Sequence, residues 1–166
     1  MNLLIKVASK ILPKKLAYAH CDIPCGIYDP HVAQMAAHTV IRMTDLIAQL
    51  KKDTDTDEAK KAYIHTLARL TKVKEAHADL VKHEINVIWG DYFKPEHLYK
   101  LPDLNQLVFD IMKMASKTKQ GIDKEAAEQL LKNVQKFAEI FYGTKGLEVV
   151  KVPSGYPSGG EIVSHK

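Results

Sequence analysis

The sequence predicts an all-α protein built as an antiparallel four-helix bundle. Apolar residues recur at spacings of three and four over four separate stretches, as in helices that bury one face. Most connections between these stretches are short, which favours antiparallel neighbours. The 166 residues have the length of one domain with a core of its own.

The first helix is expected to begin after Asp29-Pro30, because aspartate is a good N-cap and proline is favoured at the first helical position. Its apolar stripe consists of Val32, Met35, Ala36, Thr39, Met43, Leu46, Ile47 and Leu50. The polar run KKDTDTDE (51–58) then interrupts the pattern. Within this run, Asp55 and Glu58 have the spacing of a capping box, which predicts the start of a second helix.

The second helix carries an apolar stripe that also contains a histidine and a glutamate: Tyr63, Leu67, Leu70, Val73, His77, Leu80, Glu84 and Val87. We interpret His77 as a histidine of the core rather than a metal ligand. The stretch WGDYFKPEHLYKLPD (89–103) follows, and it contains Gly90, Pro95 and Pro102. These breakers predict a compact loop whose aromatic residues anchor it on the bundle.

Two further helices are separated by Gly121 and by Asp123, which is a candidate N-cap. Their apolar stripes consist of Leu104, Leu107, Val108, Ile111 and Met112 in the third helix and of Ala127, Leu130, Leu131, Val134, Phe137 and Phe141 in the fourth. The bundle therefore spans residues 29–142. The tail, residues 143–166, is rich in Gly, Pro and Ser and is expected to be loose, with Leu147–Val152 as a stretch that could pair as a strand.

The charge and hydropathy patterns argue against two classes of protein. The formal net charge is +4, and Lys6, Lys10, Lys14 and Lys15 account for all of it, so the body of the chain is neutral. A neutral body lacks the lasting basic surface that nucleic-acid binding requires. No apolar run approaches the ~20 residues of a membrane span. We therefore expect no nucleic acid as partner and no membrane span.

Residues 1–19 are predicted to be a removable leader. They are basic and apolar and end in Ala17-Tyr18-Ala19, a pattern typical of a signal-type cleavage site. Lys6 and Lys10, however, interrupt the apolar region that a secretory signal needs. We therefore expect a leader-processing peptidase and a cytoplasmic protein, with export as the alternative.

Both cysteines, Cys21 and Cys25, lie just after this leader, in AHCDIPCGIYDPH (19–31). Cleavage after Ala19 would give His20 a free α-amine beside its imidazole, and Cys21 would add an amide nitrogen and a thiolate. These donors close two fused five-membered chelate rings, and Cys25 completes a planar N2S2 set with the imidazole free to bind axially. Such a set suits Ni(II) or Cu(II) better than zinc, which prefers tetrahedral side-chain ligands. The spacing alone leaves open a small disulfide or two thiols.

Two stretches resemble the nickel superoxide dismutase family. HCDIPCGIYDP (20–30) is similar to its metal-binding hook, VKHEINVIWGDYFKPEH (81–97) is similar to its second signature, and the resemblance spans roughly residues 20–142. It implies a homohexamer of four-helix bundles with one nickel ion per subunit. The implied reaction disproportionates superoxide to dioxygen and hydrogen peroxide by Ni(III)/Ni(II) cycling, since anionic thiolate and amidate donors stabilise Ni(III).

The resemblance also assigns roles to individual residues. The metal ligands that it implies, within a hook of residues 20–28, are His20, Cys21 and Cys25. The catalytic residues that it implies are Tyr28, Asp22, Tyr92 and Lys94. The first tyrosine would screen the open face of the nickel and the aspartate would order the loop. The second tyrosine and the lysine would line the approach, where a positive charge attracts the anionic substrate.

One departure from the family pattern concerns the axial imidazole. Some family members orient it with a first-helix glutamate and a second-helix arginine, and this sequence has Ala36 and His77 at those places. Because such partners fix the tautomer and basicity of an imidazole, a replacement is expected, with His38 and His77 as the candidates.

The sequence alone leaves two other functions open. The same hook would serve a non-enzymatic nickel or copper binding protein. A helical interaction module with a redox-sensitive Cys21–Cys25 loop would bind no metal stoichiometrically.

Overall fold

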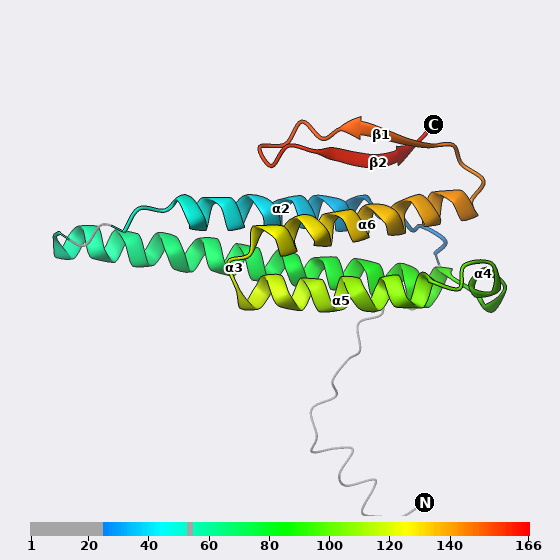
Figure 1. Cartoon of the computed structure of the whole chain (residues 1–166), viewed down its shortest axis with the longest axis horizontal. Coiled ribbons are helices and arrows are strands. Elements are labelled where there is room, and N and C mark those ends of the chain that lie inside the picture. Colours follow the sequence, from blue (N-terminus) through cyan, green and yellow to red (C-terminus); the bar gives the residue numbers. More distant parts are fainter. Residues whose placement is uncertain (1–24, 53–54) are drawn as a thin grey trace, which may run out of the picture.

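A computed structural model describes residues 25–52 and 55–166 of the chain, and Figure 1 shows their arrangement. Four long helices lie side by side: α2 (His31–Gln49), α3 (Asp57–Val87), α5 (Leu104–Gln120) and α6 (Lys124–Thr144). Each packs mainly against two of the others, so that α2, α3, α5 and α6 enclose one core. The prediction of an antiparallel four-helix bundle is confirmed. None of the described helices is long and apolar enough to cross a membrane.

The core combines large side chains from α6 with small ones from α2 and α3. Phe137 and Phe141 of α6 are completely buried, as are Ala37 of α2 and Ala78 of α3. The buried stripe of α3 lies one position later than predicted and consists of Lys74, Ala78, Val81 and Ile85. His77 is therefore only partly buried. The prediction is wrong by one position because it placed the leucines on the buried face, whereas that face includes the small Ala78 and the lysine Lys74, whose ammonium is hydrogen-bonded.

The segment between α3 and α5 is mostly helical, contrary to the predicted loop. A π-helical turn, η1 (Ile88–Tyr92), continues α3, and a short helix, α4 (Pro95–Lys100), follows it. Pro95 occupies the first turn of α4, where proline is favoured because the first amides of a helix have no partner within it. The loop prediction is wrong because this proline begins a helix instead of breaking one.

The tail forms a hairpin, so the expectation of a loose tail is wrong, whereas the suggested strand at Leu147–Val152 overlaps the first of its two strands. Strands β1 (Val149–Pro153) and β2 (Glu161–His165) pair antiparallel, with Val149 opposite His165 and Pro153 opposite Glu161. The hairpin covers α2 and α6 (Figure 1). Val163 of β2 is completely buried in the core. Gly155, Gly159 and Gly160 have positive φ and form the turn, so the glycines that suggested disorder shape a tight connection.

Candidate metal centre

The described part of the predicted hook begins at Cys25, whereas His20, Cys21 and Asp22 lie outside the described residues. Cys25 is exposed, and its Sγ accepts a hydrogen bond from the Ile27 amide at 3.4 Å. Gly26 between them has φ of 73°, a left-handed conformation that other residues rarely adopt. This turn lies directly after Cys25, whose thiolate is of the kind that soft or borderline metals favour as a ligand.

Asp29 joins the hook to the bundle. Its Oδ1 accepts a hydrogen bond from the His31 amide at 2.7 Å, at the start of α2, where a helix favours negative charge. The hydroxyl of Tyr142, on α6, donates to the same oxygen at 3.1 Å. Burial and the neighbouring Asp29 carboxylate raise the pKa of Tyr142 above its ordinary value, so its hydroxyl remains a donor. The base of the hook is thereby fixed to both α2 and α6.

The structure brings together Tyr28 and Tyr92, which are far apart in the sequence. Their ring centroids lie 6.0 Å apart at an angle of 58°. Tyr92 is held at the end of η1 by stacking on His97, with centroids 5.6 Å apart and planes 10° apart. The pairing supports the prediction that both tyrosines belong to one site.

The hydroxyl of Tyr92 has a defined hydrogen-bond role. It lies 2.8 Å from Thr144 Oγ1, and Thr144 donates its own proton to the Phe141 carbonyl oxygen at 2.7 Å. Tyr92 must therefore be the donor to Thr144. Its oxygen keeps lone pairs that can accept a further hydrogen bond.

Two lysines lie near this tyrosine, and sequence reasoning missed one of them. Lys94 is exposed, and its amide donates to His97 Nδ1 at 3.1 Å at the start of α4. The Nζ of Lys145 lies 5.7 Å from the centre of the Tyr92 ring and 4.6 Å from that of Phe141. Its spacing of four from Phe141 at the end of a helix is the signal that could have found Lys145.

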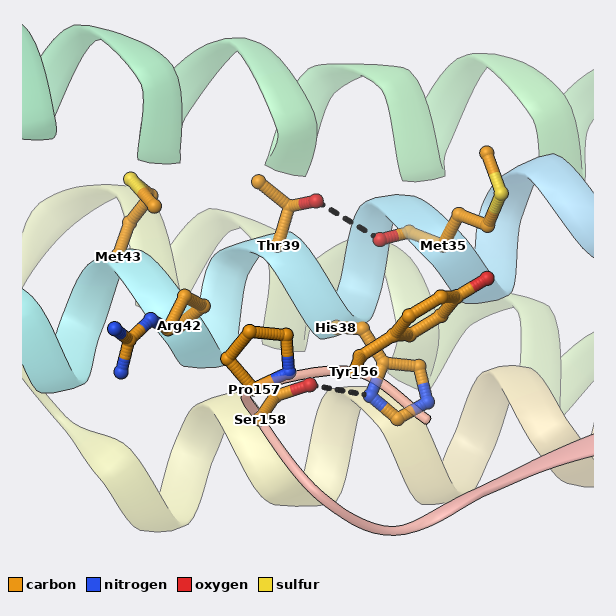
Figure 2. Close-up of a pocket in the computed structure, with 8 residues that line it drawn as sticks. All are labelled: Met35, His38, Thr39, Arg42, Met43, Tyr156, Pro157 and Ser158. Atoms are coloured by element: carbon orange, nitrogen blue, oxygen red, sulfur yellow. Dashed lines mark hydrogen bonds between the residues drawn. The ribbon is translucent and has the colours of Figure 1, made fainter. Parts of the chain in front are cut away.

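Of the two histidines considered as partners of the axial imidazole, His38 uses both ring nitrogens in contacts with the hairpin, and His77 uses Nδ1 within its own helix. His38 Nε2 lies 3.1 Å from the Glu161 carbonyl oxygen, to which it must donate, so Nδ1 accepts from the Ser158 hydroxyl at 2.9 Å. His38 borders a cavity of about 340 Å³ between α2 and the hairpin (Figure 2). Burial lowers its pKa. His77 Nδ1 donates to the Val73 carbonyl oxygen of its own helix at 2.8 Å. Both ring nitrogens of His38 are thus used by the hairpin.

A second, smaller cavity of about 190 Å³ lies beside the base of the hook. Its lining comes from the hook, α2 and the end of α3: Ile27, Tyr28, Asp29, Val32, Glu84, Val87 and Ile88. Glu84 is the one ionisable residue that α3 contributes to this lining, and it brings a carboxylate near the hook. The sequence pattern had placed Glu84 only on the apolar stripe of its helix.

Comparison with known proteins connects this arrangement to one family. Residues 15–145 match the family model described as nickel-containing superoxide dismutase. The nickel superoxide dismutase of Streptomyces coelicolor is 38% identical over 133 residues, which cover 80% of this chain and 93% of the relative. The corresponding protein of Streptomyces seoulensis is 35% identical over the same shares of the two chains.

Solved structures of such enzymes have the same fold. A native nickel superoxide dismutase superposes with a TM-score of 0.63 at 36% identity, covering 76% of this chain and 99% of the other. A nickel-containing superoxide dismutase with nickel ligation of the oxidised state gives a TM-score of 0.66 at 35% identity, with the same shares covered. The matched part of the chain contains the bundle and both stretches that carry the candidate site.

Proposed function

This chain belongs to the nickel-containing superoxide dismutase family, and we propose that its residues 20–28 form the nickel-binding hook. It is an enzyme that converts two superoxide anions and two protons into dioxygen and hydrogen peroxide, with nickel as its cofactor. The carrier alternative is not favoured, because both curated relatives are named as dismutases. The main support for this function is the family match over residues 15–145, which includes both the hook and the η1 stretch.

The ligands that we assign are His20, Cys21 and Cys25. Cys25 at its glycine turn supports this set, since borderline ions such as Ni(II) bind thiolates and no core packing covers this residue. When bound, nickel supplies a Ni(III)/Ni(II) couple that accepts an electron from one superoxide and donates one to the next. The role of the hook is to bring nitrogen and sulfur donors from a few successive residues to one point.

Tyr28, Tyr92 and Asp22 are assigned supporting roles. The two tyrosine rings, 6.0 Å apart, would narrow the access to the hook and keep the anion close to it. The Tyr92 oxygen, whose own proton goes to Thr144, would accept a hydrogen bond from water or hydrogen peroxide. Asp22 would order the loop between the two cysteines.

Positive charge at this end of the bundle would attract the substrate. Lys94 is exposed next to η1, and the Lys145 ammonium lies beside the Tyr92 ring. A small anion responds to such a local field even though the body of the chain is neutral overall. Both lysines are therefore expected to raise the rate of superoxide capture, in a manner that salt suppresses.

The decisive experiment measures superoxide decay and metal content on the chain that begins at His20. We expect about one nickel per chain together with dismutase activity. Stoichiometric nickel without superoxide consumption would indicate a carrier. A chain that binds no metal and only changes the redox state of its cysteines would indicate an interaction module.

Processing, assembly and location complete the proposal. Residues 1–19 would be removed by a peptidase, which frees the His20 amine, and a cytoplasmic location agrees with the lysines that interrupt the leader. A homohexamer is proposed from the family resemblance, and association between subunits is supported by exposed apolar side chains beside the hook, with Ile27 76% and Val32 38% exposed. Sedimentation of the processed, nickel-loaded protein should give the mass of six chains, and an active monomer would contradict this assembly.

A further inference from the structure

The C-terminal hairpin is an addition to the part of the chain that defines the family. The family model ends at residue 145, whereas β1 begins at Val149 and β2 ends at His165. In Figure 1 the hairpin lies along α2 and α6, on the side of the bundle away from α3 and α5. The matched part already contains all four long helices, so the bundle does not depend on the hairpin for its number of helices.

The hairpin is attached to the beginning of α2 by a completely buried glutamine. Gln34 Nε2 donates to the Val163 carbonyl oxygen at 2.9 Å, and Gln34 Oε1 accepts from the Val163 amide at 2.8 Å. Gln34 and Val163 are both 0% exposed. A side-chain amide that satisfies both backbone groups of one buried residue specifies a single register for β2 on α2.

Two further contacts hold the Glu161 end of β2. The Glu161 carbonyl oxygen accepts from His38 Nε2 of α2 at 3.1 Å and from Gln135 Nε2 of α6 at 2.7 Å. The hairpin therefore connects α2 and α6 across the groove between them. Because α2 carries the hook at its start, this connection restrains the helix from which the hook extends.

The other end of β2 leads directly to the base of the hook. The His165 ring packs on the Tyr142 ring, with centroids 4.8 Å apart. The Tyr142 hydroxyl donates to Asp29 Oδ1 at 3.1 Å, and the same oxygen accepts the His31 amide at 2.7 Å. Tyr142 is 3% exposed, so its ring has little freedom once His165 covers it.

We propose that the hairpin positions the nickel-binding hook, acting from His165 through Tyr142 to Asp29. Tyr142 and His165 are positioning residues, since they would act on the hook only through the Asp29 carboxylate. By fixing Asp29, they order the chain that enters the hook before the metal binds, which reduces the conformational entropy lost on binding. The inference rests on the proposed role of residues 20–28.

The test uses conservative variants, because removing the whole hairpin would expose the apolar surface under Val163 and destabilise the bundle. Tyr142→Phe keeps the ring and removes the hydroxyl that holds Asp29. His165→Ala removes the ring that covers Tyr142, and His165→Phe restores a ring at the same place. Ser154→Ala is the matched control, since Ser154 donates to the Gly159 carbonyl oxygen at 2.9 Å in the hairpin turn, away from the hook.

Two measurements are made on the chain that begins at His20. Hydrogen–deuterium exchange on the metal-free protein measures how well the backbone amides of residues 25–34 are protected. The rate at which nickel is lost to excess chelator measures how tightly the loaded hook binds the metal. We expect Tyr142→Phe and His165→Ala to speed exchange at residues 25–31 and to speed nickel loss about 10-fold. His165→Phe and Ser154→Ala should match the parent in both, and exchange in α3 and α5 should not change.

Parent-like exchange and parent-like nickel loss in both Tyr142→Phe and His165→Ala would overturn the proposal. Equal acceleration in Ser154→Ala would also overturn it, because the effect would then be general loosening of the hairpin. Failure of the hook assignment is seen separately, as a parent chain that binds no nickel. The exchange measurement on metal-free protein still decides the positioning role in that case.

Discussion

Replacing the buried Lys74 by methionine should destabilise the bundle by about 2 kcal/mol. Lys74 is 2% exposed on α3, and its Nζ donates to the Thr118 carbonyl oxygen at 2.7 Å and to that of Gly121. These carbonyls lie at the end of α5, where the last carbonyls of a helix lack partners within it and a cation is favoured. One ammonium thus satisfies a helix end across the α3–α5 contact.

The magnitude follows from what methionine leaves behind. A buried carbonyl without a partner costs about 1–3 kcal/mol, and Thr118 is 1% exposed. Gly121 is only partly buried, so its carbonyl can regain water. Methionine keeps most of the buried stem and removes the cost of burying a charge, a cost evident in the pKa of Lys74, which burial lowers. These offsets keep the expected loss near the middle of the range for one carbonyl.

The assay is equilibrium urea unfolding of the metal-free chain at one protein concentration, compared with Lys82→Met. Lys82 lies on the same helix, and its Nζ donates to Ser116 Oγ of α5 at 2.7 Å, but it is only partly buried. The control loses the same charge and should cost about 0.5–1 kcal/mol. Lys74→Met that unfolds at the same urea concentration as Lys82→Met would refute the assigned role of Lys74.

Three further predictions concern the hook and the hairpin. Cys25→Ser should abolish dismutase activity, measured as superoxide decay, with little change in thermal midpoint, because the exposed Cys25 contributes to no core. Acid should weaken the attachment of the hairpin. Burial lowers the pKa of His38 below 6.5, so on acidification the unfolded chain takes up a proton at His38 before the folded chain does. The free energy of unfolding should therefore fall as pH drops from neutral to about 5.5. His38→Gln should flatten that pH dependence of urea unfolding. One extra alanine before His20 should block nickel uptake, measured by elemental analysis, because the terminal amine becomes an amide.

The sequence predicted the bundle because its evidence is periodic and local. Spacings of three and four indicate helices whatever their neighbours, and Asp29-Pro30 indicates where α2 begins. The sequence suggested a strand at Leu147–Val152 but not its partner β2, because the stability of the hairpin depends on contacts with residues far away in the chain. Gln34 in the first turn of α2 makes both hydrogen bonds to the backbone of Val163. The residue pattern of β2 alone does not indicate that a glutamine so far away in the sequence pairs with this strand.

The residues of the candidate site likewise fall into two groups, those that local sequence indicates and those that only folding brings together. His20, Cys21 and Cys25 are suggested by chemistry that needs only neighbouring residues, because chelate rings close within a few atoms. Lys145 and Tyr142 come to the site only through folding, as α6 returns to the end of the bundle that carries the hook. A hook made of successive residues can bring donors together through chain connectivity alone, whereas fixing the chain beside it takes contacts such as that of Tyr142 with Asp29. Tyr142 comes from α6, 113 residues after Asp29, where sequence spacing gives no signal.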